Sequence, residues 1–454
     1  MAHMSGSDTF ALQLERDPLL RATVVAVAVF DRSPSWGMLV ERIDRASRLA
    51  PNFRSVLAPS PLRLAPPRWV PDPDFDLSWH LTRLRAPDPG GLGEVVEYAR
   101  HAGMAAFDHN RPLWEFTLLE GLERGRGALV MKVHHSLTDG IGGIQLAAHV
   151  VDLERDPPGM ANLPSEEAPG RPRSLDRWLD AFTYDTRSVL GHGHALLARL
   201  PGTVGRVARD PVAAVGQLAG TASSIARFVR PVLSTLSPVM TERRLLLHFD
   251  TLDVPIEGLK AAARGSGGTL NDAFIGGITG GLRRYHERHG SAVDSLRLTM
   301  PISVRTEADR PGGNRVTLVR FEVPVGIAEP GPRMRAIDDL TRSLRAERAI
   351  PYTDAIASVL NLLPIGFTAG MFKHVDFLAS DVPGFDREVF VGGAQLEAFY
   401  PFGPTLGAAA NLTLMSYRDR CHIGVSTDWG AVPDPDVFME CLHEGFEEVL
   451  ALAG

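Results

Sequence analysis

The sequence is poor in cysteine, and this excludes several classes of protein. Only two of its 454 residues are cysteines, Cys421 and Cys441. Two thiols cannot build the disulfide framework of a small secreted domain, nor a multi-cysteine zinc or iron–sulfur site. So little cysteine fits a reducing compartment, and we expect a cytoplasmic protein.

Excess positive charge and long hydrophobic runs are also missing. The chain has 47 Lys and Arg against 54 Asp and Glu, a formal net charge of −7, which argues against a general nucleic-acid-binding protein. The charge-free stretch nearest to a membrane-spanning length, Pro211 to Ala226, is short and diluted by Gly, Ser, Thr and Gln. No transmembrane helix is therefore predicted, and any membrane contact would be peripheral.

What is present is an ordinary globular composition, with 44% hydrophobic and 22% charged residues. Alternating patterns predict strands and helical spacings predict helices, mixed along the whole chain. The predicted strands are 24–30, 115–119, 128–133, 245–252, 296–302, 316–325, 411–417 and 422–427. The predicted helices are 37–49, 94–107, 141–153, 271–289, 333–349 and 435–452. The fold class is therefore α/β or α+β, with two comparable halves.

A change of composition separates these halves. Residues 156–172 are rich in Pro, Gly and Glu and are typical of a linker. The predicted division is an N-terminal half (1–155), a linker and helical connector (156–244) and a C-terminal half (245–454). Within the connector, Ser174 to Ser237 carries many arginines. It is either an amphipathic bridge packed on two domains or an element that contacts a lipid surface.

The most informative segment is His134-His135-Ser136-Leu137-Thr138-Asp139-Gly140, between a predicted strand and a predicted helix. A neutral imidazole can take a proton from a hydroxyl or amine as that group attacks a carbonyl. Asp139 could orient the His135 ring or brace the loop by pairing with an arginine, and Gly140 permits close approach of a substrate.

Other interpretations of this segment remain open. The two histidines could be one core and one surface residue, with Asp139 as a helix N-cap. A metal site is a third option, but adjacent side chains diverge on a strand and no further ligand cluster stands out. There is no Gly-x-Ser-x-Gly motif and no evident catalytic cysteine. Direct transfer without a covalent enzyme intermediate is therefore expected.

The sequence resembles the bacterial wax ester synthase/diacylglycerol acyltransferase family. His-His-x-x-x-Asp-Gly is the signature of the wider superfamily of CoA-dependent acyltransferases and peptide-synthetase condensation domains. Further segments look like motifs of the narrower family, in family order. They are Pro112-Leu113-Trp114, Asn271-Asp272, Met300-Pro301-Ile302-Ser303-Val304-Arg305 with Gly313-Asn314, Ser380-Asp381-Val382-Pro383-Gly384, Tyr400-Pro401 and Asn411-Leu412-Thr413.

The resemblance implies a fold and a reaction. The fold would be two chloramphenicol-acetyltransferase-like domains joined by a helical crossover, with an active-site channel between them. The reaction would move a fatty acyl group from acyl-CoA, a substrate and not a cofactor, to diacylglycerol or a fatty alcohol. The resemblance implies that His135 is the general base and that His134 has a secondary role. It also implies that Asp139, paired with Arg305, holds the loop in place. No cofactor or metal is implied, and peripheral contact with a membrane or lipid droplet is compatible with these substrates.

The remaining candidates have two interpretations each. Trp114 is a core residue or a substrate contact. Asn271, next to Asp272, is a helix N-cap or a hydrogen-bond donor in the pocket, and Arg305 is a solvated charge or the partner of Asp139. Glu15 reaches the site or is exposed. Ser380, Asp381, Asn411 and Thr413 are candidate substrate-binding residues.

Two departures from the family pattern bear on the substrate. Asp381 stands where asparagine is usual, which is expected to add a charge near the pocket. The segment Leu19 to Val25 lacks the family's Met-His-Val-Gly pattern.

Two rival functions keep the same fold. One is a condensation-type ester or amide former that uses carrier-protein thioesters, and the other is a non-catalytic lipid-binding protein. The absence of a fused carrier domain and the presence of Pro112-Leu113-Trp114 argue against the first, and the intact His135 and Asp139 argue against the second.

Overall fold

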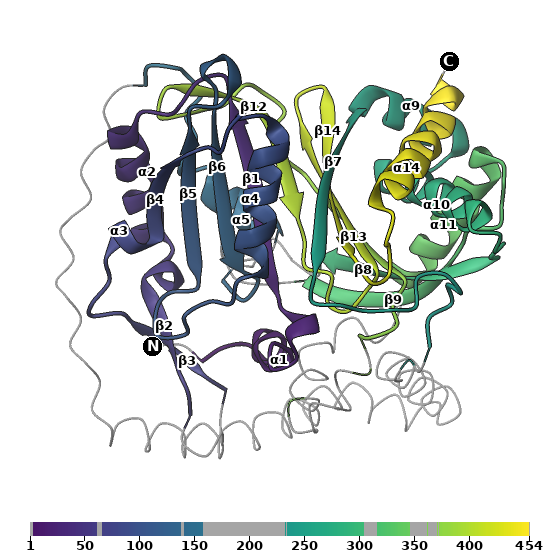
Figure 1. Ribbon diagram of the computed structural model, residues 1–454, viewed down its shortest axis with the longest axis horizontal. Coiled ribbons are helices and arrows are strands. Elements are labelled where there is room, and N and C mark those ends of the chain that lie inside the picture. Colours follow the sequence, from purple (N-terminus) through teal and green to yellow (C-terminus); the bar gives the residue numbers. More distant parts are fainter. Residues whose placement is uncertain are drawn as a thin grey trace, which may run out of the picture.

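The computed structural model describes residues 3–60, 66–137, 140–157, 232, 234–303, 316–345, 361, 370 and 372–453. These residues form two lobes that lie side by side, each built on a mixed six-stranded sheet (Figure 1). The predicted α/β class with two comparable halves is confirmed.

The first sheet has the order β11-β12-β1-β6-β5-β4, and all neighbours are antiparallel except the parallel pair β4–β5. Its strands are β1 (Thr23–Phe30), β4 (Leu81–Arg85), β5 (Trp114–Glu120), β6 (Gly127–His134), β11 (Phe390–Val391) and β12 (Ala394–Phe402). A separate hairpin pairs β2 (Ser55–Ala58) with β3 (Arg68–Pro71).

The second sheet has the order β7-β14-β13-β10-β8-β9, with β10 parallel to both of its neighbours. Its strands are β7 (Leu247–Pro255), β8 (Ser295–Ser303), β9 (Val316–Pro324), β10 (Phe377–Val382), β13 (Ala410–Tyr417) and β14 (Arg420–Asp428).

Helices cover the sheets. The α-helices are α1 (Gly6–Leu14), α2 (Trp36–Leu49), α3 (Leu77–His80), α4 (Leu92–Met104), α5 (Gly140–Ala147), α9 (Ile256–Ser266), α10 (Leu270–Arg288), α11 (Pro330–Arg345) and α14 (Pro435–Leu450). Short 3₁₀ turns occupy Pro18–Leu20, Pro51–Arg54, Glu123–Gly125 and Ala451–Ala453. None of the helices in the described part of the chain is long and apolar enough to cross a membrane.

The predicted hairpins are confirmed as β5–β6 and β13–β14. The predicted helices are confirmed as α2, α4, α5, α10, α11 and α14, with shifts at their ends. Helix α10 ends before Gly290, which has φ +67°, a left-handed conformation that glycine adopts without strain. Helix α14 starts with Asp434 as N-cap and Pro435 in its first turn.

Strand β1 shows how the sequence builds two different faces. The valines Val25, Val27 and Val29 pack in the cluster that includes α4, whereas Ala28 and Phe30 pack in the cluster that includes α2. Successive side chains of a strand point to opposite faces. On β1, one face therefore carries three valines, whereas the other carries the small side chain of Ala28 followed by the large one of Phe30.

Strand β12 crosses between the lobes. It belongs to the C-terminal part of the sequence, but it pairs with β1 in the first sheet, from Val25 opposite Phe402 to Phe30 opposite Leu396. The chain then returns to the second sheet as β13. The division at 156 and 244 stays a prediction, and sheet membership departs from it at 390–402.

The second lobe has the larger core. Helices α9, α10, α11 and α14 lie on the outer side of the second sheet (Figure 1). Helices α10 and α14 approach closely because glycines face each other: a Cβ on Gly445 would overlap the backbone of Gly277 and Gly281. The second sheet is thus held against a tightly packed helical layer.

Candidate active site

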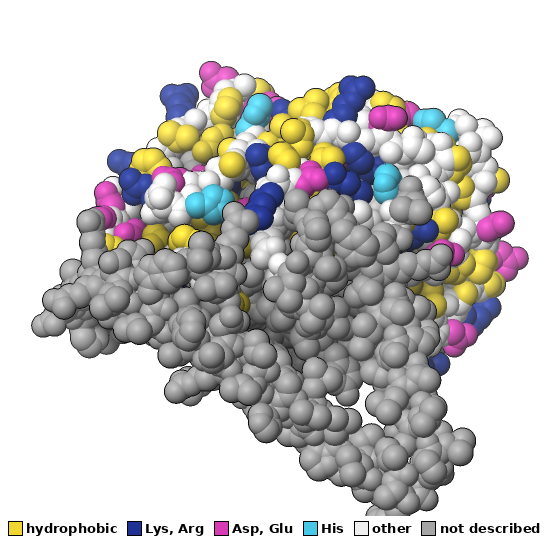
Figure 2. Space-filling model, turned by 90° about the horizontal axis from the view of Figure 1, so that it is seen from below, with side chains coloured by type: hydrophobic (Ala, Val, Ile, Leu, Met, Phe, Trp, Pro, Cys, Tyr) yellow, Lys and Arg dark blue, Asp and Glu magenta, His cyan; other side chains and the backbone are white. Residues whose placement is uncertain are grey.

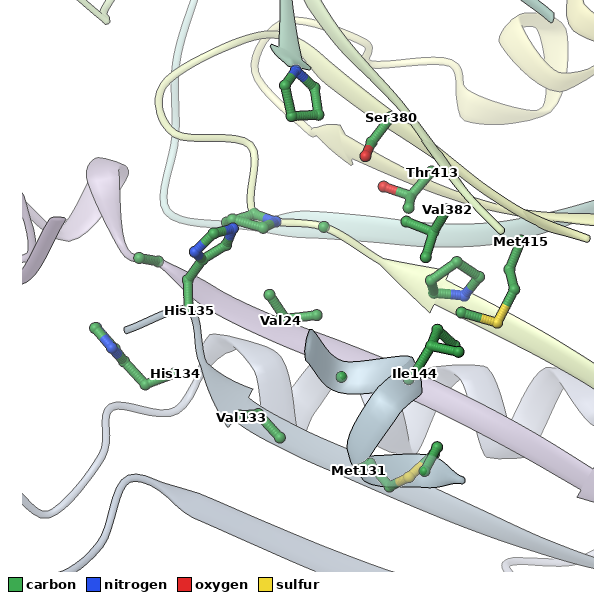
Figure 3. Close-up of a pocket in the computed structure, with 18 of the residues that line it drawn as sticks. Val24, Met131, Val133, His134, His135, Ile144, Ser380, Val382, Thr413 and Met415 are labelled. Atoms are coloured by element: carbon green, nitrogen blue, oxygen red, sulfur yellow. The ribbon is translucent and has the colours of Figure 1, made fainter. Parts of the chain in front are cut away.

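The two adjacent histidines lie at the end of β6, in the middle of the first sheet. The His134 side chain is fully buried and His135 is half-buried. The backbone N–H of His135 donates to the carbonyl oxygen of Ala22 at 2.9 Å, so the chain remains fixed just beyond the strand. Figure 3 shows the two imidazoles leaving the backbone in different directions.

The ring of His134 is held by hydrogen bonds at Nδ1, while Nε2 lies close to a carboxylate without hydrogen-bonding geometry. The backbone N–H of Ser136 donates to Nδ1 at 3.1 Å, and the Ser136 Oγ lies 2.7 Å from the same atom. Because an amide N–H can only donate, Nδ1 is the acceptor and the ring proton is assigned to Nε2. Nε2 lies 3.1 Å from Oε1 of Glu15, which follows α1.

Glu15 connects this histidine to the backbone next to His135. Its Oε1 accepts the backbone N–H of Ala22 at 3.1 Å, and the carbonyl of Ala22 accepts from His135. Burial tends to raise the pKa of Glu15, but His134 and the Ala22 N–H outweigh it and hold that pKa below 4.5. The carboxylate is therefore ionised at neutral pH and braces the end of β6.

A cavity of about 650 Å³ opens in front of His135, between the lobes. On the side of the first sheet it is bounded by β1, β6 and parts of β5 and β12, with α2 and α5 facing them. The other side is formed by β8, β9, β10 and β13 of the second sheet, and α1 contributes Phe10, Ala11 and Leu14. Most of the lining side chains are apolar, as in a pocket that holds an alkyl chain.

The wall that the second sheet contributes is more polar. Ser380 and Thr413 pair across β10 and β13, and Figure 3 shows both side chains on the cavity wall opposite the His135 strand. Thr413 Oγ1 donates to Asn411 Oδ1 at 2.9 Å, while Asn411 Nδ2 donates to the Pro404 carbonyl at 2.7 Å. The amide of Asn411 is thereby fixed, and the Thr413 oxygen keeps its lone pairs for a ligand.

One charged wall residue was not identified from the sequence. Arg320 of β9 lines the cavity and pairs in register with Thr299 of β8. Burial, together with nearby Arg297, lowers the pKa of Arg320 to about 10. Because Arg320 is the single arginine in the otherwise largely apolar strand β9, its position in the sequence could have indicated that it lines the cavity.

Trp114 is both a core residue and a part of the cavity wall. Its side chain is fully buried, and its Nε1 donates to the Phe53 carbonyl at 2.8 Å. Its ring stacks on His80, with centroids 4.6 Å apart. Because the only polar atom of Trp114 is already bonded, any substrate contact it makes is apolar.

The Asn271-Asp272 pair lies at the start of α10 and does not line the cavity. The N-cap residue is Thr269, not Asn271. Asp272 accepts from the Thr269 N–H at 2.8 Å and from the Thr341 hydroxyl at 3.0 Å, as in a capping box. Asn271 Nδ2 makes a weak contact of 3.7 Å with the sulfur of Met300. The described contacts of this pair are structural.

Asp381 is not on the cavity wall either, so the expected charge beside the pocket is absent from that surface. The neighbours Ser380 and Val382 line the cavity, and Asp381, between them on β10, does not. Burial raises the pKa of Asp381 to about 6, and its charge acts on buried Cys421. The physical reason is that successive side chains of a strand point to opposite faces, so Asp381 lies on the face opposite to Ser380 and Val382.

Other predicted site residues lie outside the described residues. These are Asp139 and Arg305, as well as most of the connector from Ser174 to Ser237. Of Gly140 the structure describes the backbone, with which α5 begins. No group of three or more His, Cys, Asp or Glu side chains within the described ranges is arranged to hold a metal ion.

Comparison with known families matches nearly the whole chain. Residues 4–274 match the wax ester synthase/diacylglycerol acyltransferase catalytic domain, and residues 312–449 match the WS/DGAT C-terminal domain. A Mycobacterium tuberculosis protein provisionally named diacylglycerol O-acyltransferase is 34% identical over 443 residues, which covers 97% of this chain and 90% of the relative.

Solved structures share the fold. A wax ester synthase/diacylglycerol acyltransferase from Marinobacter aquaeolei VT8 superposes with a TM-score of 0.66 at 22% identity, over 100% of both chains. The first condensation domain of the CDA synthetase gives a TM-score of 0.62 at 13% identity, covering 100% of this chain and 97% of that domain. The predicted relation to both groups of the superfamily is therefore confirmed at the level of the fold.

Proposed function

The chain belongs to the wax ester synthase/diacylglycerol acyltransferase family and is an acyltransferase of that family, and on that premise we propose its reaction. It transfers a fatty acyl group from a CoA thioester to an alcohol. The acceptor is diacylglycerol, which gives triacylglycerol, or a long-chain alcohol, which gives a wax ester. The observation that carries the proposal is His135 on the wall of a largely apolar cavity between the two lobes.

The proposed step needs one base and no covalent enzyme intermediate. His135 takes the proton of the acceptor hydroxyl while its oxygen attacks the thioester carbonyl carbon. The tetrahedral intermediate collapses as the new C–O bond remains and the C–S bond breaks. The leaving CoA thiolate receives the proton from the His135 imidazolium, which restores the neutral base.

Positioning residues support the base in this proposal. Glu15 and His134 brace the end of β6 through the Ala22 backbone, and this favours a positioning role for both. Asp139 and Arg305 are proposed to hold the following loop as an ion pair, on the strength of the family motif alone.

The polar wall suits the reacting groups. The Ser380 hydroxyl can donate to the oxygen of the thioester carbonyl as negative charge develops there. Thr413, whose proton goes to Asn411, can accept from a polar group of the acceptor. The apolar remainder of the cavity suits long alkyl chains.

The testing experiment measures thioester release and product together. Palmitoyl-CoA is incubated with diacylglycerol, with a long-chain alcohol, with a short alcohol, or without acceptor. We expect CoA release that requires an acceptor, with a matching ester product.

The rival functions predict other outcomes. Turnover only with a carrier-protein thioester would indicate a condensation-type enzyme. Saturable binding of acyl-CoA without release under any condition would indicate a lipid-binding protein and would refute the proposed transfer.

Contact with a lipid surface is the last part of the proposal. Leu245, Leu246 and Trp429 are 57%, 42% and 38% exposed, and the Trp429 N–H donates to the Leu246 carbonyl. They adjoin Arg244, which is exposed, whereas the neighbouring Arg243 donates to the Gly407 and Val375 carbonyls. Figure 2 shows Lys and Arg next to hydrophobic side chains on the described part of the lower face.

This contact is tested by flotation with anionic vesicles. Each arginine near an anionic surface adds about 1 kcal/mol of attraction, so binding should weaken from low to high salt. Changing Leu245, Leu246 and Trp429 together to Ser should reduce flotation. A second variant, with Arg206, Arg209, Arg227 and Arg230 changed to Gln, tests the connector. Equal flotation of wild type and both variants would contradict the proposed contact.

A further inference from the structure

The part of the cavity that runs along the first sheet has an ordered floor. On β1, Ala26 and Ala28 line it, followed by Phe30. On β6 the matching residues are Met131 opposite Ala26 and Leu129 opposite Ala28. We call the space above these five residues the alkyl arm. It leads away from His135 along the strands.

The alkyl arm narrows with distance from His135. Ala26 and Met131 are half-buried, so the empty space reaches them. Ala28 and Leu129, one step further, are 3% and 2% exposed, and Phe30 is fully buried at the end. Helix α2 closes the arm from above with Ile43, Ala46 and Ser47, all buried. The arm therefore narrows from Ala26 towards Phe30.

Its depth follows from strand geometry. Leu129 is six residues before His135, which at the rise of a strand is about 20 Å. An extended hydrocarbon chain, with C–C bonds of about 1.5 Å, advances about 1.25 Å per carbon. The alkyl arm therefore matches a linear chain of about 16 carbons between the base and the level of Ala28.

The sequence of β1 explains why the alkyl arm is empty. Residues 24–30 read Val-Val-Ala-Val-Ala-Val-Phe. The valines at 25, 27 and 29 fill the opposite face against α4. The small alanine side chains leave room above the strand, more at Ala26 than at Ala28, and the large Phe30 side chain follows where the arm is narrowest.

We infer that Ala26, Ala28 and Phe30 form a chain-length ruler for a linear alkyl group of a substrate. The inference rests on the proposed function, and it adds the size of the chain and the residues that measure it. Both the acyl group of the thioester and a long-chain alcohol carry a linear alkyl chain, so the experiment varies the length of each of them separately.

The experiment compares Ala26→Leu and Ala28→Leu with wild type. Acyl-CoA substrates from 6 to 20 carbons are used with one fixed acceptor, and then alcohols of the same lengths with one fixed acyl-CoA. A leucine at either position blocks the alkyl arm at its own depth. The positions are two residues apart, about 6.8 Å, so the two upper length limits should differ by about five carbons, with Ala26→Leu the shorter.

A matched control is Ala11→Leu on α1, which lines the cavity outside the alkyl arm. It should not produce these graded limits. Activity retained with chains of 6 to 8 carbons shows that each variant is folded. The substrate whose profile shifts is the one whose chain occupies the alkyl arm.

Other results would overturn the inference. They are unchanged length profiles in both variants, limits in the reverse order, or loss of turnover at every length in variants with an unchanged melting temperature. Absence of turnover in wild type with every donor and acceptor would instead refute the proposed function.

Discussion

The two lobes share a six-stranded sheet but use its faces differently. In the second lobe, α10 and α14 press together so closely that glycines are required at their contact. In the first lobe, Ala26 and Ala28 leave a gap between the sheet and α2. Dense packing is thus concentrated between the second sheet and its helices, and empty volume between the first sheet and α2.

This difference indicates how the fold accommodates a long cavity. A hollow costs stability because its lining loses packing contacts. The second lobe compensates with a large continuous core, and it presents the other face of its sheet as a wall of the cavity. The first lobe supplies the proposed base and the space, and the second supplies the rigid wall with its polar side chains.

The largest expected effect concerns the base. His135→Ala should lower the rate of acyl transfer by about 10²–10⁴, since that is the usual contribution of a general base. Because His135 is half-buried at the end of a strand, thermal unfolding should change little. The measurement is acceptor-dependent CoA release.

His134→Ala is the comparison for this variant. We expect a milder loss of rate and a larger loss of stability, because His134 is fully buried beside Glu15. Near-normal turnover in folded His135→Ala protein would contradict the proposal that the first lobe supplies the base.

The second prediction tests the dense packing of the second lobe. In Gly445→Ala the new methyl overlaps the backbone of α10, and such overpacking typically costs about 1–3 kcal/mol. Thermal unfolding measured by circular dichroism should shift to a lower temperature.

The matched control is Gly265→Ala in α9, where an added Cβ meets nothing within 4 Å. A helical Gly→Ala change there should stabilise the protein by about 0.5–1 kcal/mol. Equal shifts for the two variants would show that the α10–α14 contact is not especially tight.

The sequence predicted the elements that carry regular patterns, and the reason is local. The hairpin before His134 and the strand pair near the C-terminus both have clear alternation around a polar turn. Pairing over long distances could not be read in this way. Strand β12 lies beside β1 although they are near opposite ends of the chain, and no local pattern encodes that choice.

The sequence indicated which residues are candidates for the site better than it indicated how they are arranged in space. The motif indicated His135, and family resemblance indicated Ser380 and Thr413. Because β10 was not predicted as a strand, the alternation that turns Asp381 away from the cavity was missed. The contact of Glu15 with His134 depends on α1, a short helix that was also not predicted.

The third prediction sharpens the role of the polar wall. Thr413→Val keeps the shape but removes the hydroxyl, which leaves Asn411 Oδ1 without the described donor. Stability should fall by about 1–3 kcal/mol. The value of kcat/KM should also fall, by about fivefold, because a contact worth about 1 kcal/mol is lost. Thr413→Ser, which keeps the hydroxyl, should restore most of both, and failure to do so would point to packing alone.

The smallest expected effect lies in the pH dependence of stability. The pKa of Glu15 is held below 4.5 in the folded protein. A carboxyl whose pKa is depressed by folding stabilises the protein above its unfolded pKa and loses this contribution as the pH falls through the folded pKa. Wild type should therefore lose stability below about pH 4.5 more steeply than Glu15→Gln, which has no proton to bind. The measurement is the urea concentration at the midpoint of unfolding, taken from pH 7 to pH 3. The midpoints of wild type and Glu15→Gln should approach each other as the pH falls. Parallel curves over this range would mean that the carboxylate does not brace the strand end that carries His135.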